Sequence, residues 1–318
     1  RVLTRAVHYL GKAGENAVRR GAHREAIALL TQGVALLPSL PDTPERLHQD
    51  IQLHLALGVS FISTKGHAAA EVGQAFMRAW ELSQQLDHTF YLFSALRGLS
   101  ASYGMRAKFE RASEFTEHLL AIAERAHDPE MRLEASVSAG MLHFYSYGDV
   151  LVALSHFARV RELYKPAQHR AHAARYGRDP GIIGRVIEAL VLWCAGYPDQ
   201  ANQREQEALP LVQHEAAPYD QAIALIHKAF LHQHRREGCF VREPAEAVVG
   251  LATEHGLAFL LSLGTVLRGW ALIEEGQLKQ GIVAMERGIA ATQALGIEIF
   301  LVYSLSLLVE AHRRAGHC

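Results

Sequence analysis

Cysteine, excess charge of one sign and long hydrophobic runs are all scarce in this sequence of 318 residues. Its three cysteines, at positions 194, 239 and 318, are odd in number and widely spaced, which excludes a disulfide-stabilised scaffold. A formal net charge of −1 argues against a nucleic-acid-binding or polybasic membrane-surface protein, because both carry a basic excess. The longest uncharged apolar runs, such as residues 299–309, are shorter than the roughly 18–20 residues of a membrane-spanning helix. We therefore expect a cytoplasmic protein that binds neither nucleic acid nor membrane.

The motifs of nucleotide and nucleophile chemistry are absent as well. A phosphate-binding loop needs converging backbone N–H groups, usually from a glycine-rich stretch that ends in Gly-Lys-Ser/Thr, and the sequence has no such stretch. It has no Gly-x-Ser-x-Gly nucleophile elbow, and Cys194 lies in an apolar helical stretch where a thiol is usually inert. We expect no catalytic residue, no cofactor and no enzymatic activity in this chain.

Histidine is abundant, with 19 residues, so metal binding has to be considered. His227, His232 and His234 are followed closely by Cys239. On a helix, His227 and His234 share a face, whereas His232 points elsewhere and Cys239 lies past the turn. Zinc ligands on a helix are typically four residues apart and have carboxylate or thiolate partners. The pattern therefore favours structural or surface histidines, and we expect no metal site.

The most informative pattern is internal repetition. Helix-length apolar segments alternate with short turns, which are centred on Gly21, Gly66, Ala107, Gly148, Gly196, Gly238, Gly276 and Gly316. The steps from one of these residues to the next are 45, 41, 41, 48, 42, 38 and 40 residues. A period of about 40 residues with two helices per repeat is typical of a helical solenoid. It predicts eight helical pairs, the last cut short after its first helix.

Residues at fixed places around the turns support this interpretation. Small residues such as Gly14 and Gly269 precede the turns by seven residues, where a first helix has to approach its partner closely. Thr43, Asp128 and Asp179 each stand before a proline, which is the pattern of a helix N-cap. No alternating strand pattern appears. We predict an all-α fold, a right-handed helical-repeat solenoid over residues 1–318 in which each repeat contacts only its neighbours.

The segments that carry a family likeness are Leu40–Arg46, Thr64–Val72, Gln168–Arg170, Tyr176–Gly181, Gly196–Ala201 and Leu267–Ala271. The chain resembles the tetratricopeptide class of helical repeat throughout its length. More narrowly, it is similar to the C-terminal repeat region of large bacterial signal-transduction proteins, which join a nucleotide cyclase or Ser/Thr kinase domain to a STAND-type P-loop ATPase. The resemblance implies a regulatory array attached to an ATPase, and we expect the chain to be a fragment of such a protein.

An inserted segment, residues 165–181, lengthens one repeat and gathers basic and aromatic side chains. Guanidinium groups bind carboxylate or phosphate through paired hydrogen bonds, so the segment suits an anionic ligand. Alternatively, these side chains bond to neighbouring helix ends, with Asp179 capping the next helix. The candidate ligand-binding residues are His169, Arg170, Arg175, Tyr176 and Arg178.

Three hypotheses of function follow. In the first, a protein or peptide partner lies in the concave groove, where the candidate residues are Arg185, Glu188, Arg268 and Trp270. In the second, the segment 165–181 makes the array a sensor of a small anionic effector. In the third, the array is a self-association arm, because the apolar last helix at 299–309 has no second helix to cover it, and homo-oligomers would form there.

Overall fold

The structure, a computed structural model, describes residues 2–86, 88–166, 176–213 and 216–316, and within them it contains fifteen α-helices and no β-strand. The first eight helices are α1 Val2–Arg19, α2 His23–Leu36, α3 Pro44–Lys65, α4 Ala70–Ser83, α5 Thr89–Met105, α6 Phe109–Ala126, α7 Pro129–Leu142 and α8 Val150–Leu163. The others are α10 Pro180–Cys194, α11 Pro198–Gln213, α12 Pro218–His234, α13 Gly238–His255, α14 Ala258–Glu274, α15 Leu278–Ala294 and α16 Leu301–Arg314. Leu37–Ser39 forms a 3₁₀ turn and His143–Tyr147 a π-helical turn.

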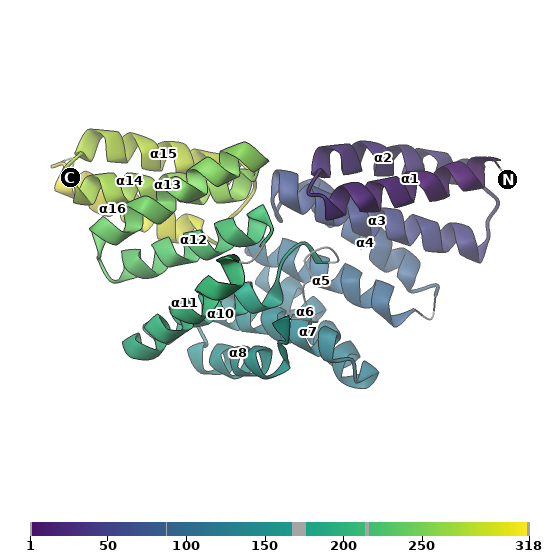
Figure 1. Ribbon diagram of the computed structural model, residues 1–318, viewed down its shortest axis with the longest axis horizontal. Coiled ribbons are helices and arrows are strands. Elements are labelled where there is room, and N and C mark those ends of the chain that lie inside the picture. Colours follow the sequence, from purple (N-terminus) through teal and green to yellow (C-terminus); the bar gives the residue numbers. More distant parts are fainter. Residues whose placement is uncertain (1, 87, 167–175, 214–215, 317–318) are drawn as a thin grey trace.

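These helices pair as the repeats predict. Seven pairs, from α1 with α2 to α14 with α15, follow one another in an arc, and α16 is the unpaired first helix of an eighth (Figure 1). The prediction of an all-α helical-repeat solenoid is confirmed. The second helices form the outer layer, whereas α5, α10 and α14 are enclosed by neighbours on nearly every side.

The turns within the pairs depend on one residue in the left-handed backbone region. Glycine supplies this conformation at most turns, since it has no Cβ to clash. The sequence interpretation is wrong at one turn, because Arg236 with φ 62° takes this position and Gly238 already belongs to α13. With that correction the left-handed residues of the turns that follow α10, α12, α14 and α16 stand at regular positions, namely 196, 236, 276 and 316.

The expected helix caps are present. The side chain of Thr43 accepts a hydrogen bond from the backbone of Arg46, at 3.3 Å, and begins α3. Asp128 caps α7 through the backbone N–H groups of Glu130 and Met131, at 2.8 and 3.1 Å. Each cap satisfies N–H groups that the helix itself leaves unpaired, and together they fix where the first helices start.

The arc closes on itself, which the sequence did not predict. Gly66, in the turn after α3, lies against Phe259 of α14. Farther along, the backbone N–H of Glu298 donates to the carbonyl oxygen of Met105 at 2.9 Å, joining the α15–α16 connection to the end of α5. The expectation that each repeat contacts only its neighbours is therefore wrong, and the inner faces of α5, α7, α10, α12 and α14 line a common central cavity.

The last helix leaves an apolar face uncovered. Val302, Leu305 and Val309 of α16 are 78%, 39% and 68% exposed. They lie three and four residues apart, so they share one face of the helix. In the described part of the chain, none of the helices is long and apolar enough to cross a membrane.

Candidate ligand-binding groove

The inserted segment is described only in part. His169, Arg170 and Arg175 lie outside the residues that the structure describes. Tyr176 and Arg178 lie inside them, and both are buried, at 3% and 8% exposure. They belong to a short strip, residues 176–179, that crosses the inner face of the arc before α10 begins.

Tyr176 is held by side chains of α5. The guanidinium group of Arg97 donates from Nη2 to the Tyr176 carbonyl oxygen at 2.9 Å, and its carbon lies 4.8 Å from the centre of the Tyr176 ring. The ring centres of Phe90 and Phe93 are 6.4 and 6.5 Å from that of Tyr176. An arginine of a first helix thus binds both the backbone and the ring of a segment that lies in the groove.

The next two residues join the strip to other first helices. Nη2 of Arg178 lies 3.4 Å from the carboxylate of Glu134 on α7. The backbone N–H of Asp179 donates to Oδ1 of Asp220 on α12, at 2.9 Å. The side chain of Asp179 in turn accepts hydrogen bonds from Gly181 and Ile182, at 2.7 and 3.2 Å, so it caps α10. Helix capping was the alternative to ligand binding in this segment, and for Asp179 that alternative is correct.

Asp179 combines a helix cap with a buried side-chain contact, because its second carboxylate oxygen accepts the Tyr164 hydroxyl at 3.0 Å. We expect Asp179→Ala to lower the free energy of unfolding by about 2 kcal/mol, the sum of a lost cap and a lost buried hydrogen bond. Asp149→Ala is the matched control, since the exposed Asp149 caps α8 through Val152 alone and should cost about 1 kcal/mol or less. Urea unfolding of both variants measures the difference, and equal losses would contradict the buried role of Asp179.

The charged side chains around the strip are buried and shift one another's pKa. Burial, together with the nearby Arg178 and Arg97, lowers the pKa of His67 to about 3, so this histidine is neutral at pH 7. Burial also lowers the pKa of Arg97, against the opposing effect of Glu134. For Asp220, burial raises the pKa to about 7 although the Asp179 N–H group favours its charged form.

Beside the strip is an open groove between α1, α3 and α5. Its cavity volume is about 470 Å³. The lining residues combine aromatic, polar and charged side chains, and they include Glu15, Arg19, Gln52, Phe76, Phe90, Tyr91, Ser94, Arg97 and Tyr176. Two of the buried polar atoms here, Oγ of Ser94 and Nε of Arg97, have no hydrogen-bond partner. The sequence reasoning missed Arg97, although it is the only charged residue between Thr89 and Met105 and that isolation was a usable signal.

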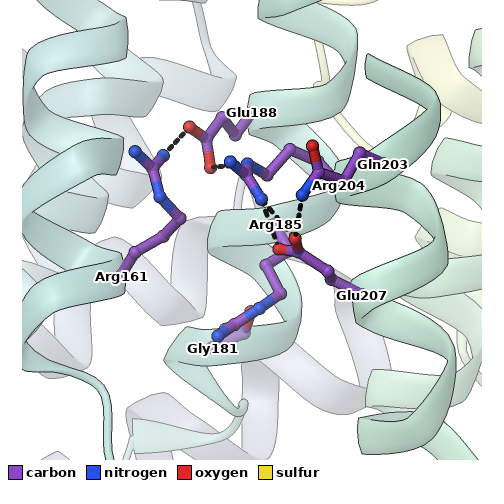
Figure 2. A network of polar contacts seen from close by, with 7 residues as sticks. All are labelled: Arg161, Gly181, Arg185, Glu188, Gln203, Arg204 and Glu207. Atoms are coloured by element: carbon purple, nitrogen blue, oxygen red, sulfur yellow. Dashed lines mark hydrogen bonds and ion pairs between the residues drawn. The ribbon is translucent and has the colours of Figure 1, made fainter. Parts of the chain in front are cut away.

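Arg185 and Glu188, two of the expected groove residues, lie in a polar network between α8, α10 and α11 (Figure 2). Glu188 is 3% exposed and pairs with Arg161 on one side and Arg204 on the other. Arg185 donates to the Gly181 carbonyl oxygen at 3.0 Å and lies over the Tyr164 ring. The structure thus places both residues in contacts between helices.

The other two groove candidates lie on α14. Trp270 is 2% exposed and belongs to the hydrophobic core of the second half of the chain. Arg268 is half-buried, and its Nε atom is buried without a hydrogen-bond partner. The structure does not bring these two residues together with Tyr176 and Arg178.

The histidines of α12 have local partners. Nδ1 of His227 and Nδ1 of His234 bond to the carbonyl oxygens of Ile223 and Phe230, both at 2.8 Å. Among the described residues there is no group of three or more His, Cys, Asp or Glu side chains that would hold a metal ion.

Neither a protein-family model nor a curated protein sequence matches this chain. Its fold is similar to that of the Rap conjugation gene regulator of the plasmid pLS20 in complex with the Phr* peptide, with TM-score 0.69, 13% identity and coverage of 91% of this chain and 74% of that one. It is also similar to a Rap protein complexed with Competence and Sporulation Factor, with TM-score 0.67, 12% identity and coverage of 98% and 87%. For the apo form of RapI the TM-score is 0.63 at 12% identity, with coverage of 90% and 97%. At these identities the likeness shows the fold, a tetratricopeptide-type solenoid.

Proposed function

We propose that this chain is a non-catalytic recognition module that binds an extended peptide, or a peptide-like segment of a partner protein, in the groove between α1, α3 and α5. The observation that carries the proposal is Arg97, which already binds a backbone carbonyl and an aromatic ring in that groove, those of Tyr176. Peptide binding needs such contacts to backbone groups together with pockets for side chains. Two of the solved structures of similar fold contain a peptide or a factor as ligand, which supports the same proposal.

The rim of the groove provides the test. Arg19 lines the groove at the end of α1 and is exposed, so Arg19→Glu should change partner binding without disturbing the core. We expect peptides selected from a random peptide library on the wild-type chain to bind Arg19→Glu at least about tenfold more weakly, a typical loss for one reversed charge contact at an interface. Arg111→Glu is the matched control, because Arg111 is an exposed residue of α6 that pairs with Glu114.

Equal weakening by Arg19→Glu and Arg111→Glu would contradict the groove, since it would show a response to net charge only. A library that yields no binder to the wild-type chain would contradict peptide recognition itself.

We further propose that the module regulates an attached signalling ATPase, as the resemblance to bacterial cyclase- and kinase-linked proteins implies. A partner that binds the groove biases such an ATPase only when it has different affinities for the off and on states. The coding sequence before Arg1 tests this. A reading frame that continues into a Gly-Lys-Ser/Thr loop and a cyclase or kinase domain supports it, and a start codon next to Arg1 contradicts it.

Self-association through α16 is a second candidate, favoured by the exposed apolar face of Val302, Leu305 and Val309. Large apolar faces on soluble proteins commonly mark contacts with another chain. Light scattering over a range of concentrations tests it, and a mass that stays monomeric at the highest concentration contradicts it.

A further inference from the structure

The centre of the arc contains a second cavity, which lies next to the groove between α1, α3 and α5 and shares Arg97 with it. It is small, about 80 Å³, and it is lined mainly by α5, α7, α10, α12 and α14. Aromatic and aliphatic side chains make most of its wall, among them Met105, Met141, Ile187, Phe259 and Phe300. A cavity of this volume has room for about six water-sized groups.

Three basic side chains reach the same cavity. They are His67, Arg97 and Arg178, and each is at least nine-tenths buried. Each also has a nitrogen without a hydrogen-bond partner: Nδ1 of His67, Nε of Arg97 and Nη1 of Arg178. Buried polar groups in proteins are nearly always hydrogen-bonded, and guanidinium nitrogens only donate, so the Arg97 and Arg178 atoms at one cavity indicate a missing acceptor.

The acidic groups nearby have other partners. Glu134 pairs with Arg178, and Asp179 caps α10 and accepts the Tyr164 hydroxyl. Asp220 accepts the Asp179 N–H group. In the part of the chain that the structure describes, no carboxylate lies within 4.0 Å of the Arg97 guanidinium group, so this buried cation lacks an ion pair.

We propose that the central cavity binds a small molecule with one carboxylate and a short apolar chain. The carboxylate accepts hydrogen bonds from Nε of Arg97 and Nη1 of Arg178, and the chain lies among the apolar side chains. Guanidinium groups match a carboxylate, whereas the apolar wall and the small volume disfavour a phosphate ester or a nucleotide. This ligand is distinct from the proposed peptide and occupies a neighbouring cavity, although Arg97 lines both.

Thermal unfolding of the whole chain with sodium butanoate tests the proposal. Because a ligand that binds only the folded state raises Tm, we expect butanoate to raise it by a few degrees. Three compounds serve as controls. Acetate has the carboxylate but lacks the longer apolar chain, and butan-1-ol has the chain but lacks the charge. Butylammonium has the chain and the opposite charge. All three should raise Tm less than butanoate does at equal ionic strength, and octanoate should exceed the cavity and also raise Tm less.

The variant Arg97→Met tests whether Arg97 binds a ligand or only stabilises the fold. A buried cation without an ion pair destabilises the folded state, and an apolar residue of similar length does not. We expect Arg97→Met to lose the response to butanoate. Its Tm without ligand reflects two opposing changes, the removal of a buried cation and the loss of the hydrogen bond to the Tyr176 carbonyl oxygen. Arg111→Met should keep the full response, and so should Arg19→Glu even if it has lost peptide binding.

Three results would overturn the proposal: a flat response of the wild type to butanoate, an equal response to butan-1-ol, or an unchanged response in Arg97→Met. In the first case water alone satisfies the three nitrogens. None of these results would bear on peptide binding, which the library experiment measures separately.

Discussion

Gly269→Ala is expected to lower the free energy of unfolding by about 3 kcal/mol, although alanine is the better helix former. A Cβ atom at Gly269 would lie 2.7 Å from the carbonyl oxygen of Gly281 and 2.9 Å from the backbone nitrogen of Met285, both on α15. These are backbone atoms of a packed helix, so no rotamer change relieves the contact. The two helices have to move apart, and the contacts around them are lost.

Gly250→Ala is the matched control for this substitution. Gly250 is an exposed residue of α13, and a Cβ atom there would have no neighbour within 4 Å. The same chemical change should therefore raise the free energy of unfolding by about 0.5–1 kcal/mol, the difference in helix propensity. Urea unfolding at pH 7 measures both variants. A loss at Gly269 no larger than about 1 kcal/mol would mean that α14 and α15 do not pack as closely as the structure has them.

The close approach of α14 and α15 was predictable, whereas the closing of the arc was not. A small residue at Gly269, seven before a turn glycine, belongs to a pattern that repeats along the chain, and the pattern has a local cause in helix packing. The contact between Glu298 and Met105 uses backbone groups, which every residue has, so no residue type marks it. Pairings between distant backbone segments depend on the accumulated geometry of all the repeats between them.

In the candidate site, too, the features with a local cause were predictable and those that depend on distant segments were not. Asp179 was predicted as a cap because Asp before Pro has a local meaning, and the structure confirms it. Arg97 gained its meaning only when Tyr176 was placed against it, 79 residues later in the sequence. Trp270 and Glu188 were expected on an open groove, but both are buried. Each lies on a helix that is apolar on almost every side, so the sequence does not indicate which neighbouring helix covers it.

The remaining prediction of large size concerns pH. We expect the free energy of unfolding of Asp220→Asn to fall by about 2 kcal/mol more than that of the wild type between pH 7 and pH 5. His67 and His227 are buried, and burial lowers their pKa to about 3 and about 4 in the folded chain. In the unfolded chain both take up protons below about pH 6.5, so each costs about 2 kcal/mol of stability by pH 5.

Asp220 acts in the opposite direction in the wild type. Its pKa is raised to about 7 in the folded chain, well above the value of an exposed aspartate, so the folded state binds the proton more tightly. The stability that this proton adds is fully present below about pH 4 and is lost as the pH rises to about 7. Between pH 7 and pH 5 it offsets about 2 kcal/mol of the histidine effect, and asparagine removes that offset while its oxygen still accepts the Asp179 N–H group.

The measurement is urea unfolding at pH 7 and pH 5 for wild type, Asp220→Asn and Asp149→Asn. Asp149 is exposed, so its amide variant should follow the wild-type pH dependence and control for the loss of one acidic group. All other titrating residues are common to the three proteins, so the difference in slope reports Asp220 alone. Parallel pH profiles for wild type and Asp220→Asn would mean that Asp220 stays charged in the folded chain. The balance of charge around Arg178 would then be more negative than the structure indicates, and the case for a carboxylate ligand beside it would weaken.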